Sequence, residues 1–167
     1  DLAFAAFGTI RGGPAKVAVV SSALFGSISG SPIANVVSTG TFTIPLMKKV
    51  GYEPEYAGAV EAVASTGGQI MPPIMGAAAF IMAQSMGVPY MTIVRAAILP
   101  AFLYYFMVLI SIHLVAVKGG MKGLPASQLP DFKETLKKSW FLILPIGVLV
   151  YMLVVLRLST NKAALYC

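Results

Sequence analysis

The stretch Gly26-Ser-Ile-Ser-Gly-Ser-Pro32 is a polar bend between two apolar arms. The arm before it includes Ala15 to Leu24, and the arm after it runs from Ile33 to Met47. At roughly 14 or 15 residues, each arm would be about 21 to 23 Å long as a helix, whereas the hydrocarbon core of a bilayer is about 30 Å thick. Because such arms are too short to cross, we predict a re-entrant helical hairpin over residues 14–47.

The tip of this hairpin is expected to line a site. Irregular backbone at membrane depth is tolerated only where protein or a water-filled cavity satisfies its amides and carbonyls. Ser31 can cap the free amides of the second arm, and Pro32 suits the first position of a helix. Those amides form the positive end of a helix dipole, which favours a carboxylate nearby.

The composition is that of a membrane protein. The chain has 167 residues, of which 57% are hydrophobic and only 11% are charged, far from the usual make-up of a soluble domain. Its net charge of +6 forms no basic patch with interleaved aromatic residues, so we expect no nucleic-acid partner. The single cysteine, Cys167, excludes a disulfide framework. The first residues have neither an initiator Met nor a signal-peptide pattern, so we expect part of a longer polypeptide.

A second interruption lies in the apolar segment from Tyr56 to Met86, which as one straight helix would be about 46 Å long. Within it, Thr66-Gly-Gly-Gln-Ile-Met-Pro-Pro73 combines paired glycines with paired prolines. The prolines remove two backbone donors, and the glycines weaken the turn before them. We therefore predict a broken transmembrane helix over residues 56–86, made of two half-helices with an unwound centre.

The remaining segments complete an all-α integral membrane fold with two further transmembrane helices. Residues 1–13 are predicted to be the end of a preceding helix and a linker, and residues 159–167 a truncated end. The nearly uncharged segment 93–117 and the segment 140–158 are the predicted spans. Between them, residues 118–138 are polar and are predicted to form a loop.

Basic residues indicate the orientation of these spans. A hairpin returns the chain to the side that it left, so the ends of the hairpin and the 118–138 loop share one face. Of the 12 Lys and Arg residues, nine fall on this face: Arg11, Lys16, Lys48, Lys49, Lys118, Lys122, Lys133, Lys137 and Lys138. The other three are Arg95, Arg157 and Lys162. By the positive-inside rule, the hairpin base and the loop are cytoplasmic. If the two arms crossed the membrane completely instead of forming a hairpin, the same nine basic residues would share one face.

Two broken elements in succession indicate a transporter, because interrupted helices place helix ends near the middle of the bilayer. The arm that ends near Ser29 and the half-helix that ends near Gly68 offer spare carbonyls. Carbonyl and hydroxyl oxygens suit a monovalent cation such as Na⁺, whereas zinc prefers His or Cys. We expect Na⁺ as the coupling ion and no covalent cofactor.

Packing alone is the alternative for each of these features. The small residues at the tip could serve close helix contact, and the Pro72-Pro73 pair could be a kink without a ligand. Glu61, the acidic residue inside a predicted span, is expected to snorkel or to be paired rather than to act as a functional carboxylate. His113 is expected to be an interfacial side chain. Because no nucleophile and base are paired, we expect no enzyme activity.

Several of these motifs resemble the large membrane subunit of tripartite ATP-independent periplasmic (TRAP) transporters. They are Gly26-Ser-Ile-Ser-Gly-Ser-Pro-Ile-Ala-Asn35, Thr39-Gly-Thr-Phe-Thr-Ile-Pro-Leu-Met47, Gly51-Tyr and Gly67-Gly-Gln-Ile-Met-Pro-Pro73. The likeness is greatest to the fused permeases of the TAXI branch and covers about residues 8–86. It implies an elevator-type carrier built of inverted repeats, of which this chain holds the first-repeat hairpin and the helices that follow.

The resemblance also implies a site. A sodium ion would be held, in part by backbone carbonyls, between the hairpin tip and the broken helix, and the substrate carboxylate would lie beside it. The implied sodium ligands are Ser29, Gly30, Ser31, Asn35, Thr66, Gly67 and Met71. The implied substrate contacts are Ser31, Asn35 and Pro72. The second hairpin and second broken helix that complete the family's site are absent from this sequence, so we do not expect the segment alone to transport.

The function expected from this resemblance is sodium-coupled import of a small organic anion across the bacterial inner membrane. The expected partners are a periplasmic substrate-binding protein, the remaining half of the permease and the lipid bilayer. The alternative is a structural or assembly subunit of a membrane complex, in which the broken helices only pack. A channel is disfavoured, because no ring-forming filter motif is present.

Overall fold

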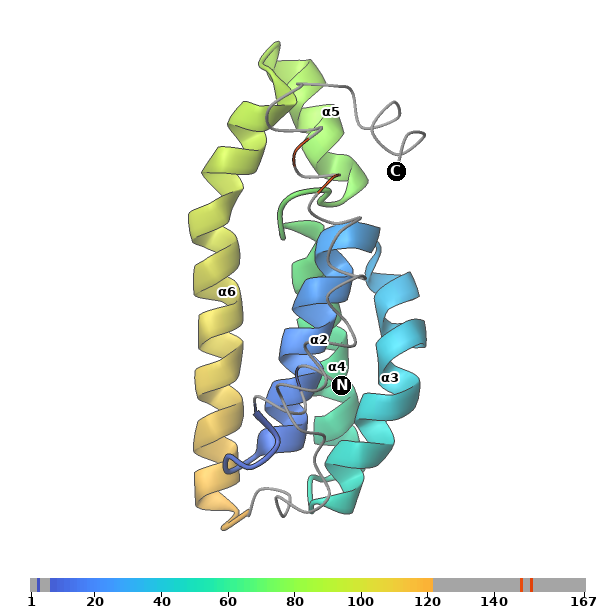
Figure 1. Cartoon of the computed structure of the whole chain (residues 1–167), viewed down its shortest axis with the longest axis vertical. Helices are drawn as coiled ribbons and strands as arrows, with labels where there is room; N and C mark the ends of the chain where they lie inside the picture. Colours follow the sequence, from blue (N-terminus) through green and yellow to red (C-terminus); the bar gives the residue numbers. More distant parts are fainter. Residues whose placement is uncertain (1–2, 4–6, 122–147, 149–150, 152–167) are drawn as a thin grey trace.

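A computed structural model describes residues 3, 7–121, 148 and 151 of the chain (Figure 1). These residues form helices joined by short turns, which confirms the predicted helical class. The predicted span at 140–158 and the truncated end at 159–167 lie almost wholly outside the described residues. So do most of the 118–138 loop and, within the preceding-helix segment 1–13, residues 1, 2 and 4–6.

The polar bend joins two antiparallel helices, α2 (Gly13–Ser29) and α3 (Pro32–Lys49). Helix α2 ends at Ser29, and the next residue, Gly30, takes a left-handed conformation with φ of 61°. Ser31 then caps α3, since its side chain accepts a hydrogen bond from the Ala34 amide, and Pro32 is the first helical residue. The predicted helix start is therefore confirmed. The arms have 17 and 18 residues, slightly more than the sequence suggested.

The second apolar segment is divided into α4 (Pro54–Thr66), the short 3₁₀ turn η1 (Gly67–Gln69), an irregular stretch, and α5 (Ala77–Met86). The last turn of α4 is held by α6, because Tyr104 and Tyr105 donate hydrogen bonds to the carbonyls of Val63 and Ala64. The Val63 carbonyl also accepts a hydrogen bond from the Gly67 amide, so backbone and tyrosine donors together secure the end of α4. A Cβ on Gly67 would lie 2.5 Å from the Tyr104 ring, so this position requires glycine.

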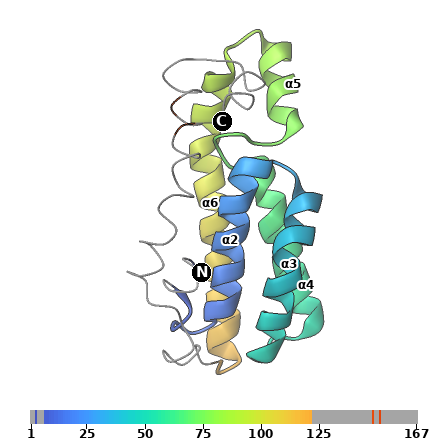
Figure 2. The ribbon, with the colours of Figure 1, turned by 45° about the vertical axis from the view of Figure 1, so that its right-hand side comes forward.

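Helix α6 (Tyr90–Lys118) has 29 residues and includes the predicted segment 93–117. Within the described part of the chain it is the one helix of 18 or more residues that is apolar enough to cross a membrane. It runs along the full length of the bundle, while α2, α3 and α4 lie together beside its C-terminal half and α5 packs on its N-terminal half (Figures 1 and 2). Helix α2 lies in the middle, in contact with α3, α4 and α6.

The main hydrophobic core lies where α2, α4 and α6 meet and includes Val19, Met47, Val60 and Ile112. A second, smaller cluster joins α5 to α6 through Ala79, Ala83, Ile93 and Val94. Large apolar side chains remain exposed along α3 and α6, among them Ile33, Phe42, Leu99 and Phe102. Apolar surface of this extent indicates contact with lipid or with further protein.

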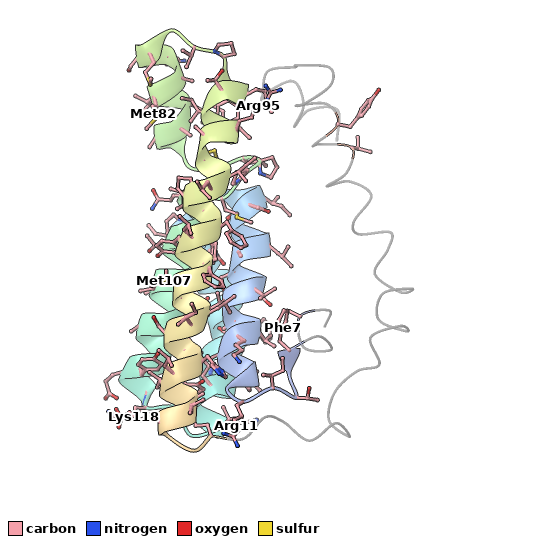
Figure 3. All side chains as sticks on the ribbon, turned by 90° about the vertical axis from the view of Figure 1, so that its left-hand side faces the viewer. Phe7, Arg11, Met82, Arg95, Met107 and Lys118 are labelled. Atoms are coloured by element: carbon pink, nitrogen blue, oxygen red, sulfur yellow. The ribbon has the colours of Figure 1, made fainter. Side chains whose placement is uncertain are left out.

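Three basic residues lie at the ends of the bundle where the sequence analysis expected them. Arg11 and Lys118 lie at the same end, and Arg95 lies toward the opposite end (Figure 3). At the first end, Lys16 Nζ donates to His113 Nδ1 at 3.0 Å, so His113 has a specific partner. Tyr52, in the turn between α3 and α4, is buried there, and burial raises its pKa to about 12, with a smaller effect of Tyr56.

Candidate functional site

The hairpin tip and the interruption after α4 are in direct contact. The α carbons of Gly26 and Gly68 approach so closely that a Cβ on Gly26 would lie 2.6 Å from Gly68 Cα. Beside them, the Ile74 amide donates to the Ser27 carbonyl at 3.2 Å. The two breaks in regular structure thus meet in space, although about forty residues separate them in the sequence.

Oxygen atoms gather where these breaks meet. In the described part of the chain, the hydrogen bonds of this region leave the carbonyl oxygens of Ser29, Gly30 and Met75 without a donor. The Ser29 hydroxyl accepts from the Ser31 amide at 3.4 Å. Carbonyl oxygens without a hydrogen-bond donor are available to a cation, and oxygen ligands suit hard cations.

Met75 is a residue that the sequence analysis did not single out. It takes a left-handed conformation with φ of 62° and is 6% exposed. Non-glycine residues with this backbone conformation are uncommon and gather at functional sites. Its carbonyl faces Gly30 so closely that a Cβ on Gly30 would lie 1.9 Å from the oxygen. The side-chain pattern gave no signal for this position, because backbone conformation determines its role.

Asn35 lies just below the tip and is fully buried. Its side-chain amide donates to the Ser22 carbonyl at 2.8 Å, and its Oδ1 lies 3.2 Å from the Thr39 hydroxyl, which can donate to it. In this conformation Asn35 therefore joins α3 to α2 and supports the tip from inside. Ser31, by contrast, is half-buried and lies at the tip itself.

The remaining residues of the implied site lie in different surroundings. Thr66 is exposed, and its hydroxyl donates to the Ala62 carbonyl of its own helix at 2.8 Å. Met71 and Pro72 line an apolar pocket of about 340 Å³ together with Ala23 on α2 and Tyr105 on α6. Gly30 thus contacts Met75 and Gly76, and Asn35 lies beside the contact between Gly26 and Gly68. Met71 and Pro72 border α6 instead.

Glu61 was predicted to snorkel or to be paired. Its side chain is fully buried, so snorkelling is wrong. It does have partners, which are hydroxyls: Ser22 at 3.1 Å and Ser65 at 3.3 Å, with Thr39 and Thr43 in addition. The sequence gave a signal that could have been used, since Asn35, Thr39 and Thr43 recur every four residues and line one helix face.

A helical bundle with a long apolar helix and two polar interruptions in apolar segments is typical of a membrane permease. Over residues 1–166 the sequence matches the family described as "Tripartite ATP-independent periplasmic transporter, DctM component". This chain therefore belongs to the DctM family of large TRAP permeases, and the family resemblance seen in the sequence is confirmed. Because this is a family of transport proteins, it supports the expectation that the chain is not an enzyme.

Curated relatives agree with this family. The chain is 34% identical over 151 residues to the C4-dicarboxylate TRAP transporter large permease protein DctM of Vibrio cholerae, covering 88% of this chain and 32% of that protein. It is 29% identical to the protein of the same description in Pseudomonas aeruginosa, with 89% and 35% covered. It is 26% identical to the ectoine/5-hydroxyectoine TRAP transporter large permease protein UehC of Ruegeria pomeroyi, with 89% and 35% covered. The chain thus spans about a third of the length of these relatives.

Proposed function

We propose that this chain is the part of a TRAP permease that holds the coupling ion in sodium-driven uptake of an organic anion. The observation that carries the proposal is the contact between the hairpin tip and the interruption after α4, at Gly26 and Gly68. Within the described residues, the two breaks leave the carbonyls of Ser29, Gly30 and Met75 without a hydrogen-bond donor. Carbonyl oxygens at broken helices are suitable ligands for a sodium ion. The TAXI-type assignment and the elevator mechanism remain predictions.

The proposed sodium site is built from the carbonyls of Ser29, Gly30 and Met75, with the Ser29 and Ser31 hydroxyls beside them. Gly67 contributes by allowing the interruption to turn against α6, and Asn35 contributes by supporting the tip from below. The free amides of α3 begin next to this site, and a carboxylate placed there would be attracted by both the ion and the helix dipole. A carboxylate substrate is therefore the proposed cargo, in line with the C4-dicarboxylate named for two relatives.

The proposed setting is the bacterial inner membrane, with a periplasmic protein that delivers the substrate. The hairpin base, marked by Arg11 and the end of α6, is proposed to be cytoplasmic. The exposed apolar faces of α3 and α6 are proposed to contact lipid and the remaining part of the permease. The 118–138 loop is proposed to share the cytoplasmic face.

Ser31→Ala tests the proposal in the complete permease that contains this segment. The Ser31 hydroxyl caps an amide at the exposed start of α3, so its loss is expected to leave the protein folded while uptake driven by a sodium gradient falls at least tenfold. Asn35→Ala is expected to abolish uptake. Ser38→Ala, at an exposed position of the same helix, is the matched control. Uptake would be measured in proteoliposomes, with folding followed by gel filtration and thermal melting.

Normal sodium-dependent uptake by folded Ser31→Ala and Asn35→Ala proteins would contradict the site. The hairpin and the broken helix would then serve packing alone, as in a structural or assembly subunit.

A further inference from the structure

Glu61 is a buried carboxylate whose surroundings the tip site does not explain. It lies on α4, and its oxygens are within hydrogen-bond distance of hydroxyls from α2, α3 and α4 itself. These hydroxyls belong to Ser22, Thr39, Thr43 and Ser65. Gly40 leaves room for the Glu61 side chain, since a Cβ at this position would lie 3.1 Å from Glu61 Cγ. The three helices thus meet around one acidic group.

No positive charge accompanies this carboxylate in the described part of the chain. On α2, the basic residue Lys16 is bonded to His113 at the end of the bundle. On α3, Lys48 and Lys49 are exposed in the last turn, and on α4 the other acidic residues, Glu53 and Glu55, are exposed at its start. On α6, the hydroxyls of Tyr104 and Tyr105 are committed to carbonyls of α4. An isolated charge buried among apolar helices is costly unless it is neutralised.

The hydroxyls around Glu61 have more acceptors than hydrogens. The Thr39 hydroxyl has one hydrogen but lies 2.8 Å from the Asn35 carbonyl and 3.2 Å from Asn35 Oδ1, in addition to Glu61 Oε1. The Thr43 hydroxyl lies 3.0 Å from the Thr39 carbonyl as well as near Glu61 Oε2. Each threonine can therefore donate either to the carboxylate or to the carbonyl one turn before it.

These two hydrogen-bond states have opposite electrostatic character. When the threonines donate to Glu61, they stabilise the bare carboxylate. When the threonine hydroxyls donate to carbonyls of their own helix, their lone pairs point toward Glu61. The carboxylate and hydroxyl oxygens then require a positive charge between them. One formal negative charge with four hydroxyl oxygens is a ligand set for a single monovalent cation.

We propose that Glu61, with the hydroxyls of Ser22, Thr39, Thr43 and Ser65, binds one sodium ion at a site separate from the hairpin tip. The Thr39 hydroxyl contacts both Glu61 and the side chain of Asn35, so occupancy at Glu61 also changes the hydrogen bonding that supports the tip. The site concerns this chain's own side chains and does not depend on sodium binding at the tip.

Infrared difference spectroscopy of the complete permease tests this site without a transport measurement. Spectra would be recorded on replacing choline chloride with NaCl at constant pH. We expect a carboxylate band to shift on sodium addition and this shift to be lost in Glu61→Gln. A sodium-dependent shift that requires Glu61 identifies the site.

Matched variants separate this site from its neighbours. Thr43→Val is expected to weaken the apparent affinity for the cation at least fivefold, whereas Thr41→Val, at an exposed position on the same helix, leaves it unchanged. Glu55→Gln, exposed on the same helix as Glu61, retains the sodium-dependent shift. Spectra of folded Glu61→Gln identical to those of the unsubstituted permease would overturn the proposal, as would the absence of any carboxylate response to sodium.

Discussion

At the scale of single residues, the tip depends on two left-handed positions that face each other, Gly30 and Met75. Gly30 needs glycine for two reasons, its φ of 61° and the Met75 carbonyl that occupies the place of a Cβ. Met75 has a side chain and is buried against α5 and α6, which holds it in this conformation. The contact between hairpin and interruption is thus determined by backbone geometry at two positions.

We predict that Gly30→Ala destabilises the fold by more than about 3 kcal/mol, because it adds a backbone clash to the cost of a left-handed alanine. Gly87→Ala is the matched control, since Gly87 has φ of 63° but open space around it. It should cost only about 1 kcal/mol. Denaturant unfolding of the two purified variants in mild detergent measures the difference. Equal loss of stability in both would show that Met75 does not press against Gly30.

Residues of the tip could be predicted because their chemistry is unusual for an apolar segment. Ser31 and Pro32 follow the rules of helix capping, and the structure has them at the predicted positions. The full burial of Glu61 was not predicted, because an acidic side chain inside a membrane span was expected to snorkel or to be paired. Its burial depends on hydroxyls that reach it from α2 and α3, and a single sequence does not show which helix faces meet.

At the scale of elements, the irregular stretch between η1 and α5 is held by α6. The Tyr90 hydroxyl donates to the carbonyls of Pro73, at 3.2 Å, and Ile74, and the Tyr90 ring stacks on Phe80 with centroids 4.4 Å apart. The Ile74 amide in turn bonds the hairpin at Ser27. One side chain at the start of α6 therefore positions the backbone that touches the tip.

We predict that Tyr90→Phe loosens this stretch without unfolding the bundle, because phenylalanine keeps the stacking but frees two carbonyls. Hydrogen exchange at the Ile74 and Gly76 amides should become about 5- to 10-fold faster, the size expected for the loss of one net hydrogen bond. Tyr104→Phe, which removes a hydrogen bond to the Val63 carbonyl instead, is the control. If both variants changed exchange at Ile74 alike, or neither did, Tyr90 would not be its anchor.

Element boundaries were less predictable than element types. Helix α3 continues through Pro45 to Lys49, although proline in a helix interior costs about 3 kcal/mol. Next to the proline, Met47 is fully buried in the main core, and this packing keeps the last turn helical. Similarly, the interruption extends to Gly76, beyond the prolines, because the bonds of Ile74 and Gly76 hold the chain away from helical geometry.

At the scale of the whole molecule, the hairpin is shorter than the helix beside it. The arms of 17 and 18 residues are about 26 Å long, whereas the 29 residues of α6 extend about 44 Å. The tip therefore reaches only part of the way along α6, and α5 occupies the remaining length (Figure 1). The sequence indicated this inequality through segment lengths, whereas only the family resemblance implied that the tip lies against the second interruption.

A re-entrant hairpin makes a prediction about access that two full crossings do not. In a permease with Cys167→Ser, we would place single cysteines at Lys49 near the hairpin base, Ile33 near the tip and Ser85 at the end of α5, all exposed in the isolated bundle. A membrane-impermeant maleimide should label Ser85→Cys from the periplasm and Lys49→Cys only from the cytoplasm. Ile33→Cys should resist labelling from both sides, because the tip then lies within the bilayer. Periplasmic labelling of Ile33→Cys as fast as that of Ser85→Cys would mean that α2 and α3 cross the membrane completely. In that case the free carbonyls of the tip would face water, where hydration satisfies them, and they would no longer require a sodium ion.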